Sequence, residues 1–136
     1  MERIIGQISI LVKDYDEAIN YYTNVLGFEL VEDTVLTPEK RWVVIKPKNS
    51  SGQGCKLLLA RAANPHQENF IGNQSGGRVF LFMYTDDIQR DHEMLLKNDV
   101  KIIRGPIKEE FGTVLVFCDL YGNLWDLIEP SKSTAC

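Results

Sequence analysis

The sequence predicts an α+β fold in which two βαβββ half-repeats form a curved, cup-like mixed sheet with helices on the outside. Three observations predict this fold. Apolar residues alternate with other residues along several short segments, as in a strand with one packed face. Two longer segments carry apolar residues at helical spacing instead. The same order of elements appears twice along the 136 residues, which indicates an internal duplication.

The first half-repeat covers about residues 4–61. It begins with an alternating strand over Ile4–Val12 and continues with a helix from about Asp16 to Leu26, with Asp16 as its N-cap. Gly27 is the expected residue after this helix, because glycine adopts left-handed backbone conformations without a steric penalty. The three strands expected next are Phe28–Thr34, Arg41–Lys46 and Cys55–Ala60, separated by Thr37-Pro38 and by a Ser/Gly turn over Asn49–Gly54.

The second half-repeat covers about residues 78–130 and follows a linker over about residues 62–77. Within that linker, Asn64–Gly76 is rich in amides and glycine, so we expect no helix or strand there. Both half-repeats are expected to belong to a single domain of residues 1–136. The elements expected in the second half-repeat are a strand over Val79–Tyr84, a helix over Ile88–Lys97, and strands over Ile102–Ile103, Thr113–Phe117 and Leu124–Ile128.

Superposing the two half-repeats in sequence pairs residues that should occupy equivalent positions. Gln7 corresponds to Phe80 and Asp14 to Asp87 near the two first strands, and Leu58 corresponds to Asp126 on the two last strands. If two such sheets curve into a cup, its concave side is where a small ligand would bind.

The overall composition narrows the class of partner. The net charge is −4 and the charges are interspersed, which argues against nucleic acid or an anionic membrane surface. The three cysteines, Cys55, Cys118 and Cys136, form no C-x-x-C pair, so neither a disulfide framework nor a zinc–thiolate site is expected. No signal peptide or membrane-spanning stretch is recognisable, and we expect a soluble, cytoplasmic protein whose partner is a small molecule.

Two motifs near the ends of the chain resemble those of a known superfamily. The segment Asp14–Tyr22, followed by Leu26-Gly27-Phe28-Glu29, resembles the opening signature of the vicinal-oxygen-chelate proteins, and Phe117–Pro130 resembles their closing signature. This superfamily includes glyoxalases, bleomycin-resistance proteins and extradiol dioxygenases. The resemblance implies the glyoxalase/bleomycin-resistance/dihydroxybiphenyl-dioxygenase-like fold, and the glycine and turn residues of both motifs serve that fold rather than any chemistry.

The resemblance also implies where a metal would bind. Enzymes of the superfamily hold a divalent cation through residues on the first and last strand of each half. Carried over to this sequence, those positions hold Gln7, Leu58, Phe80 and Asp126. Only Gln7 and Asp126 can coordinate, and a divalent cation requires about four to six ligands. We therefore expect no bound metal and no other cofactor, while a divalent metal on Gln7 and Asp126 remains the alternative.

The strand alternation predicts a set of side chains on the concave side of the sheet. An apolar and aromatic lining with a few polar groups suits a hydrophobic or aromatic compound, although the same aromatic residues could simply fill the cup as core. Trp125 should point the opposite way and pack against a helix, and Arg41 is an edge charge that a carboxylate ligand could use. The predicted ligand-binding residues are Gln7, Ser9, Trp42, Leu58, Phe80, Phe82 and Asp126.

Three functional hypotheses follow from the sequence. The first is a metal-free protein that binds a hydrophobic or aromatic compound, similar to the bleomycin-resistance branch. The second is a lyase or isomerase similar to glyoxalase, with an atypical divalent-metal site or with Asp126 as the catalytic proton-transfer base. The third is a structural or regulatory homodimer whose cup is filled by its own side chains. A homodimer is expected in any case, because proteins of this superfamily and size commonly pair.

Overall fold

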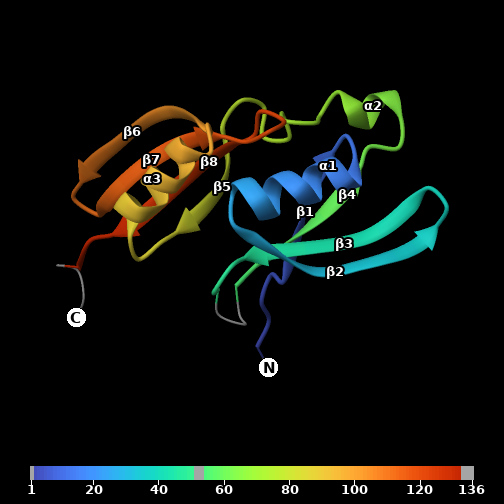
Figure 1. The fold of residues 1–136 in the computed structure, drawn as a ribbon, viewed down its shortest axis with the longest axis horizontal. Helices are drawn as coiled ribbons and strands as arrows, with labels where there is room; N and C mark the ends of the chain where they lie inside the picture. The colour runs from blue at the N-terminus through green and yellow to red at the C-terminus, as the bar shows by residue number, and fades with distance from the viewer. Residues whose placement is uncertain (1, 51–53, 133–136) are drawn as a thin grey trace. The chain divides into compact units, whose positions relative to one another are not determined.

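The structure is a computed structural model that describes residues 2–50 and 54–132. It contains two four-stranded mixed sheets, each formed by one βαβββ module, which confirms the α+β class and the duplication (Figure 1). Contacts divide the chain into two compact units, one ending at Ile71 and the other starting at Gly72. No helix among the described residues is long and apolar enough to cross a membrane.

The first unit has the strand order β1-β4-β3-β2. Strand β1 pairs in parallel with β4, and β4 and β2 each pair antiparallel with β3. Strand β1 begins at Gln7, three residues later than predicted, because its pairing with β4 starts there, and Ile4 and Ile5 are left exposed. The elements are β1 Gln7–Val12, α1 Tyr15–Asn20, η1 Tyr21–Val25, β2 Phe28–Thr37, β3 Lys40–Pro47, β4 Lys56–Arg61 and α2 Pro65–Glu68.

The first helix differs from the prediction at its start and in its second half. Asp14, not Asp16, is the N-cap, since its carboxylate accepts a hydrogen bond of 2.8 Å from the backbone N–H of Glu17. The helix continues as a π-helical turn, η1, up to Val25. Gly27 then ends it with a φ of 75°, as the glycine at this position predicted.

The segment predicted to be a linker without secondary structure contains a short helix, α2. The prediction was wrong because Asn64-Pro65 is a helix start rather than a turn. The Asn64 side chain accepts a hydrogen bond from the backbone N–H of Gln67, and Pro65 occupies the first helical turn, where it needs no backbone donor. The Ser/Gly turn predicted over Asn49–Gly54 lies partly outside the described residues.

The second unit repeats the topology, with the order β5-β8-β7-β6. Strand β6 is much longer than the predicted Ile102–Ile103, because register shifts on both sides of Arg104 let it continue past Gly105 and Pro106. Gly105 has a φ of 87°, and a Cβ there would lie 2.6 Å from the carbonyl oxygen of Val114. The elements are β5 Val79–Tyr84, α3 Ile88–Lys97, β6 Lys101–Glu109, β7 Gly112–Cys118 and β8 Leu124–Pro130.

The core of each unit lies between its sheet and its helices. Strand residues that point toward the helix are almost fully buried, and the alternating residues on the same strands point away from it. Removing these apolar side chains from water supplies most of the driving force for folding. The buried core includes the strand residues Ile10, Val12 and Leu59 and the η1 residue Tyr22 in the first unit, and the strand residues Leu115, Phe117, Trp125 and Leu127 in the second.

Candidate functional site

A row of side chains crosses all four strands of the second sheet. Phe82 on β5 is the register partner of Asp126 on β8, Asp126 is the partner of Val116 on β7, and Val116 is the partner of Arg104 on β6. Directly paired residues point to the same face of a sheet, so these four side chains share one face. We call this the Phe82–Arg104 row.

The row lies on the face that points away from α3. On β8 the neighbouring residues, Trp125 and Leu127, are buried, and the Glu129 carboxylate accepts a hydrogen bond of 2.9 Å from the backbone N–H of Ile88 at the start of α3. The alternation therefore directs Asp126 to the opposite face. We call that surface the helix-free face of the second sheet.

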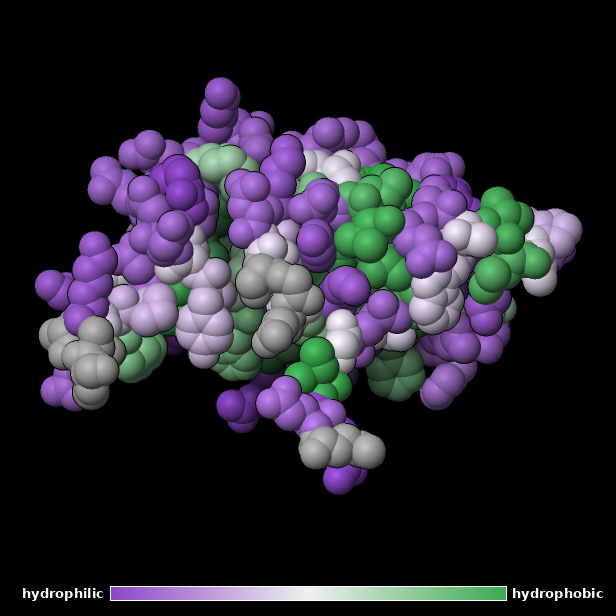
Figure 2. All heavy atoms as spheres, turned by 90° about the horizontal axis from the view of Figure 1, so that it is seen from below, coloured by the Kyte–Doolittle hydropathy of each residue, from purple (hydrophilic) through white to green (hydrophobic). Residues whose placement is uncertain are grey.

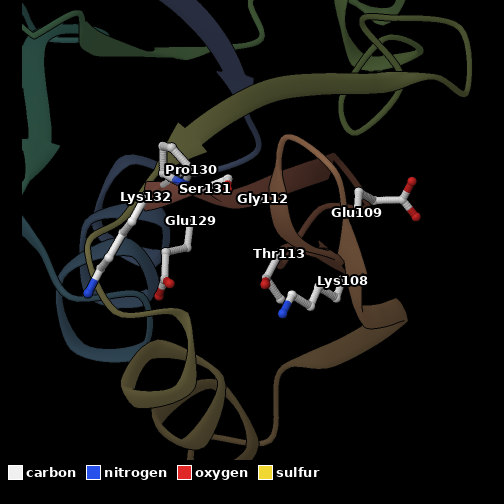
Figure 3. Close-up of a pocket in the computed structure, with 8 residues that line it drawn as sticks. All are labelled: Lys108, Glu109, Gly112, Thr113, Glu129, Pro130, Ser131 and Lys132. Carbon is white, nitrogen blue, oxygen red and sulfur yellow. The ribbon is translucent and has the colours of Figure 1, made fainter. Parts of the chain in front are cut away.

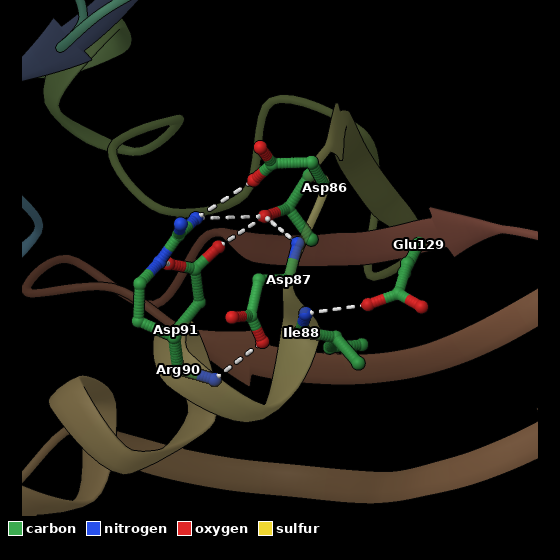
Figure 4. Close-up of polar contacts among 7 residues, drawn as sticks. Asp86, Asp87, Ile88, Arg90, Asp91 and Glu129 are labelled. Atoms are coloured by element: carbon green, nitrogen blue, oxygen red, sulfur yellow. Dashed lines mark hydrogen bonds and ion pairs between the residues drawn. The ribbon is translucent and has the colours of Figure 1, made fainter.

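The start of α3 is fixed by a polar network on the other side of the sheet. Asp87 caps the helix by accepting from the backbone N–H of Arg90, whose guanidinium bonds Asp86 and Asp91 (Figure 4). Glu129 contributes from β8. These carboxylates bind groups at the start of α3. On strand β8, Asp126 is the acidic residue that lies on the helix-free face instead.

The helix-free face combines a buried apolar floor with exposed aromatic rings. Val114, Val116 and Ile128 are buried, whereas Phe82 is 60% exposed and Tyr84 is 68% exposed. Exposed apolar side chains also interrupt the hydrophilic surface elsewhere in the molecule, as the green areas of Figure 2 illustrate. Two adjacent exposed rings on one strand form a surface on which a flat molecule can stack.

Asp126 is the polar group in the middle of this surface. Its Oδ1 atom is inaccessible to solvent and has no hydrogen-bond partner among the described residues. Burial raises the pKa of this carboxyl above its ordinary value, while the positive charge of Arg104 acts in the opposite direction. A buried carboxyl oxygen without a donor costs stability, so Oδ1 of Asp126 is an unused hydrogen-bond acceptor of this face.

The first sheet carries the other predicted ligand-binding residues. Ser9 on β1 is the register partner of Leu58 on β4, and Leu58 is the partner of Val44 on β3. Since Leu57 and Leu59 are buried and α1 packs against β4, Leu58 points away from α1, as predicted. Gln7 lies two residues before Ser9, opposite Lys56. Trp42 pairs with Thr34 and is half-buried.

The structure thus brings together Phe82 and Asp126 in one unit, and Ser9 and Leu58 in the other. Phe80 lies at a bulge between Val79 and Leu81. Sequence reasoning missed Arg104, whose exposed side chain belongs to the same row as Asp126. The signal was obscured because the bulges of β6 break the alternation that would have placed Arg104 on a face.

The four positions where the superfamily holds a metal do not fit a divalent cation. Leu58 and Phe80 have no donor atom, which leaves one donor in each unit. Gln7 is a neutral donor whose register partner on β4 is Lys56, and Asp126 has a raised pKa beside Arg104. Among the described residues, no three His, Cys, Asp or Glu side chains are grouped as a metal site.

Arg41 is held by its own carboxylates rather than free for a ligand. Its guanidinium forms ion pairs of 2.7 Å with Asp33 and 3.0 Å with Asp16, and it lies over the ring of Tyr15. The hydrogen bond from Arg41 lowers the pKa of Asp33. Arg41 therefore joins α1 to the β2–β3 hairpin.

A separate pocket of about 280 Å³ lies at the far end of strands β6, β7 and β8 (Figure 3). It is smaller than the roughly 300–1,000 Å³ typical of small-molecule sites. Its carboxylate Glu129 already binds the start of α3. The pocket is lined by Lys108, Glu109, Gly112, Thr113, Glu129, Pro130, Ser131 and Lys132.

Comparison with known families agrees with the resemblance seen in the sequence. A family model described as the Glyoxalase/Bleomycin resistance protein/Dioxygenase superfamily matches residues 4–127. The chain belongs to this superfamily. An uncharacterized superfamily relative from Shewanella frigidimarina (strain NCIMB 400) is 52% identical over 130 residues, which cover 95% of each chain.

Solved structures of similar proteins share the superfamily fold. The crystal structure of UcmS2 is 26% identical, with a TM-score of 0.80 over 94% of this chain and 98% of the other. The structure of TnmS3, an antibiotic binding protein from Streptomyces sp. CB03234, is also 26% identical, with a TM-score of 0.75 over 96% and 98% of the two chains. Membership in the superfamily supports small-molecule binding as the general function.

Proposed function

We propose that this protein binds a hydrophobic or aromatic small molecule on the helix-free face of its second sheet, without a metal ion and without turning the compound over. The observation that carries this proposal is the pair of exposed rings, Phe82 and Tyr84, beside the buried and unpartnered Oδ1 of Asp126. Rings supply stacking area, and a single polar group fixes the orientation of the ligand. The description of TnmS3 as an antibiotic binding protein supports the same class of function.

The test is a binding screen of aromatic compounds on the purified full chain, with isothermal calorimetry to measure affinity. Phe82→Ala should weaken binding of any hit by about tenfold, since a well-packed ring contributes roughly 1–2 kcal/mol. Phe111→Ala is the matched control, because Phe111 is 56% exposed but lies in the turn between β6 and β7. Equal losses in both variants would contradict the proposed site.

Elemental analysis of untagged protein tests the metal-free part of the proposal. Metal well below one equivalent per chain is the expected result, since Leu58 and Phe80 offer no donor atom. Near-stoichiometric metal that is lost in both Gln7→Ala and Asp126→Ala would overturn it.

A second candidate function is proton transfer by Asp126. Its raised pKa would make its carboxylate a stronger base than an ordinary one, which suits a lyase or isomerase. The two functions separate in Asp126→Asn, which would abolish turnover in an enzyme but leave an aromatic compound bound. A substrate screen with and without added divalent metal measures this difference.

We also propose that the protein is a cytoplasmic homodimer. Exposed apolar side chains at Ile4, Ile5 and Val35 support self-association, since each is at least 70% exposed. Sedimentation velocity at several concentrations tests the assembly state, and a monomer at all concentrations would contradict it.

A further inference from the structure

Arg104 is an exposed arginine with no hydrogen bond or ion pair among the described residues. Three other arginines are engaged in structural contacts. Arg41 pairs with two carboxylates, Arg90 binds Asp86 and Asp91, and Arg61 donates to the carbonyl oxygen of Glu39. The guanidinium of Arg104 instead lies on the helix-free face with all of its donors available.

The charges around the Phe82–Arg104 row favour an anion. Strand β6 contributes Arg104 and also Lys101, which is the register partner of Cys118 on β7. The carboxyl of Asp126 is the acidic group in the row, and its pKa is raised by burial. The two basic side chains of β6 therefore outnumber the one carboxyl of the row.

We propose that the ligand of this site is an aromatic anion, and that Arg104 is the residue that determines this specificity. The inference rests on the proposed function, because it assigns a chemical class to the ligand of the same face. The ligand ring stacks on Phe82 and Tyr84, and its anionic group binds the guanidinium of Arg104.

The spacing of the strands fits this arrangement. Phe82 and Arg104 are three strands apart, which places their Cα atoms roughly 14 Å from each other. The arginine side chain spans part of that distance, and a bicyclic ring spans the remainder. Asp126 lies between them, as the register partner of Phe82 and of Val116.

The experiment compares three probes of nearly equal shape on the full chain by calorimetry at pH 7. Naphthalene-2-sulfonate is an anion, naphthalene-2-sulfonamide is neutral, and 2-naphthylmethylammonium is a cation. We expect the sulfonate to bind about tenfold more tightly than the sulfonamide, because a hydrogen bond to a charged group contributes roughly 1.5–3 kcal/mol. The ammonium compound should bind most weakly, and added NaCl should reduce only the advantage of the sulfonate.

Two variants and one control identify the residue responsible. Arg104→Gln should bring the affinity of the sulfonate down to that of the sulfonamide, while Arg104→Lys should keep part of the difference. Lys97→Gln removes an exposed positive charge at the end of α3, which covers the opposite face, and should change neither affinity. Circular dichroism verifies that each variant is folded.

The possible failures are distinguishable. Binding of all three probes with equal affinity, unchanged in Arg104→Gln, would overturn the inference while leaving the proposed function intact. Failure of every probe to bind would overturn both. A dimer that dissociates in Phe82→Ser, together with no probe binding, would mean that a second copy of the chain covers the face, and this result also overturns the inference.

Discussion

The two half-repeats build the same row of four side chains with different chemistry. In the first half the row runs Ser9, Leu58, Val44 and Glu32, and in the second half it runs Phe82, Asp126, Val116 and Arg104. The valine on the third strand is retained. The other three positions exchange a small polar residue for an aromatic one, an aliphatic residue for an acid, and an acid for a base.

The difference teaches which positions serve the fold and which serve a ligand. Leu58 occupies the centre of the first row, beside Val44. The topology of the sheet is therefore compatible with an apolar residue at this position. Asp126 occupies the equivalent position with a buried oxygen that finds no donor among the described residues. A donor on a bound ligand would satisfy this oxygen, and this possibility is part of the proposed function.

A second acid, Asp119, sharpens the contrast because it is more buried than Asp126 and both of its carboxylate oxygens accept hydrogen bonds. Its carboxylate accepts hydrogen bonds from the backbone N–H groups of Tyr121 and Asn123, from the Asn123 amide, and from Nε1 of Trp125 at 2.9 Å. These bonds hold the turn between β7 and β8 in place.

The largest expected effect is therefore the loss of Asp119. Asp119→Ala should lower the free energy of unfolding by about 3 kcal/mol, because it leaves several buried donors without an acceptor. Urea denaturation followed by Trp fluorescence measures the change. A loss no larger than that of Asp91→Ala, whose acid binds the exposed Arg90, would contradict this interpretation.

Placing the acid of the second row into the first should have the next largest effect. Leu58→Asp should lower the free energy of unfolding by about 2 kcal/mol, since it removes apolar burial and puts a carboxyl between Ser9 and Val44. Urea denaturation measures the free energy of unfolding of this variant. Leu58→Asn is the control, because its side chain has nearly the same shape as aspartate but carries no charge. An unchanged stability in Leu58→Asp would mean that this position is not apolar in solution.

Most of the fold was predictable because it depends on local periodicity. The strand Val79–Tyr84 and the helix Ile88–Lys97 have the predicted limits, and Asp14 and Asp87, which the sequence pairs as equivalent positions, are the N-caps of α1 and α3. The errors occurred where a local pattern is ambiguous. Asp14 and Asp16 are both good caps, and only the hydrogen bond to Glu17 decides between them.

The candidate site was less predictable because it depends on register. Alternation predicted that Phe82 and Asp126 share a face, and the pairing of β5 with β8 agrees. Arg104 could not be assigned, since the two bulges of β6 on either side of it are tertiary features without a periodic signal. The sequence also could not show that Oδ1 of Asp126 has no hydrogen-bond partner, because this depends on which side chains surround it in the folded protein.

Removing the acid from the second row should have a smaller effect of opposite sign. Asp126→Leu makes this position equivalent to Leu58 and should raise the free energy of unfolding by about 1 kcal/mol at pH 7, because an unsatisfied buried oxygen is lost. Urea denaturation measures the stability of this variant against that of the natural chain. A destabilised variant would indicate that Asp126 supports the fold.

The smallest expected effect is the dependence of this gain on pH. Because burial raises the folded-state pKa of Asp126 above its unfolded value of about 3.9, the protonated form is favoured in the folded state. Its contribution to stability is present below the unfolded pKa and is lost as the pH rises through the folded pKa. Asp126→Asn, which does not titrate, should therefore gain stability relative to the natural chain between these two values.

This gain should remain constant at higher pH and disappear below the unfolded pKa. Urea denaturation of both proteins from pH 3 to pH 8 measures it, and Asp86→Asn provides the control with an exposed acid. A gain that instead grew as the pH fell would mean that the carboxylate form of Asp126 is the one stabilised by the fold. In that case Arg104 would be its partner, and the second row would be a structural ion pair rather than a site for an anion.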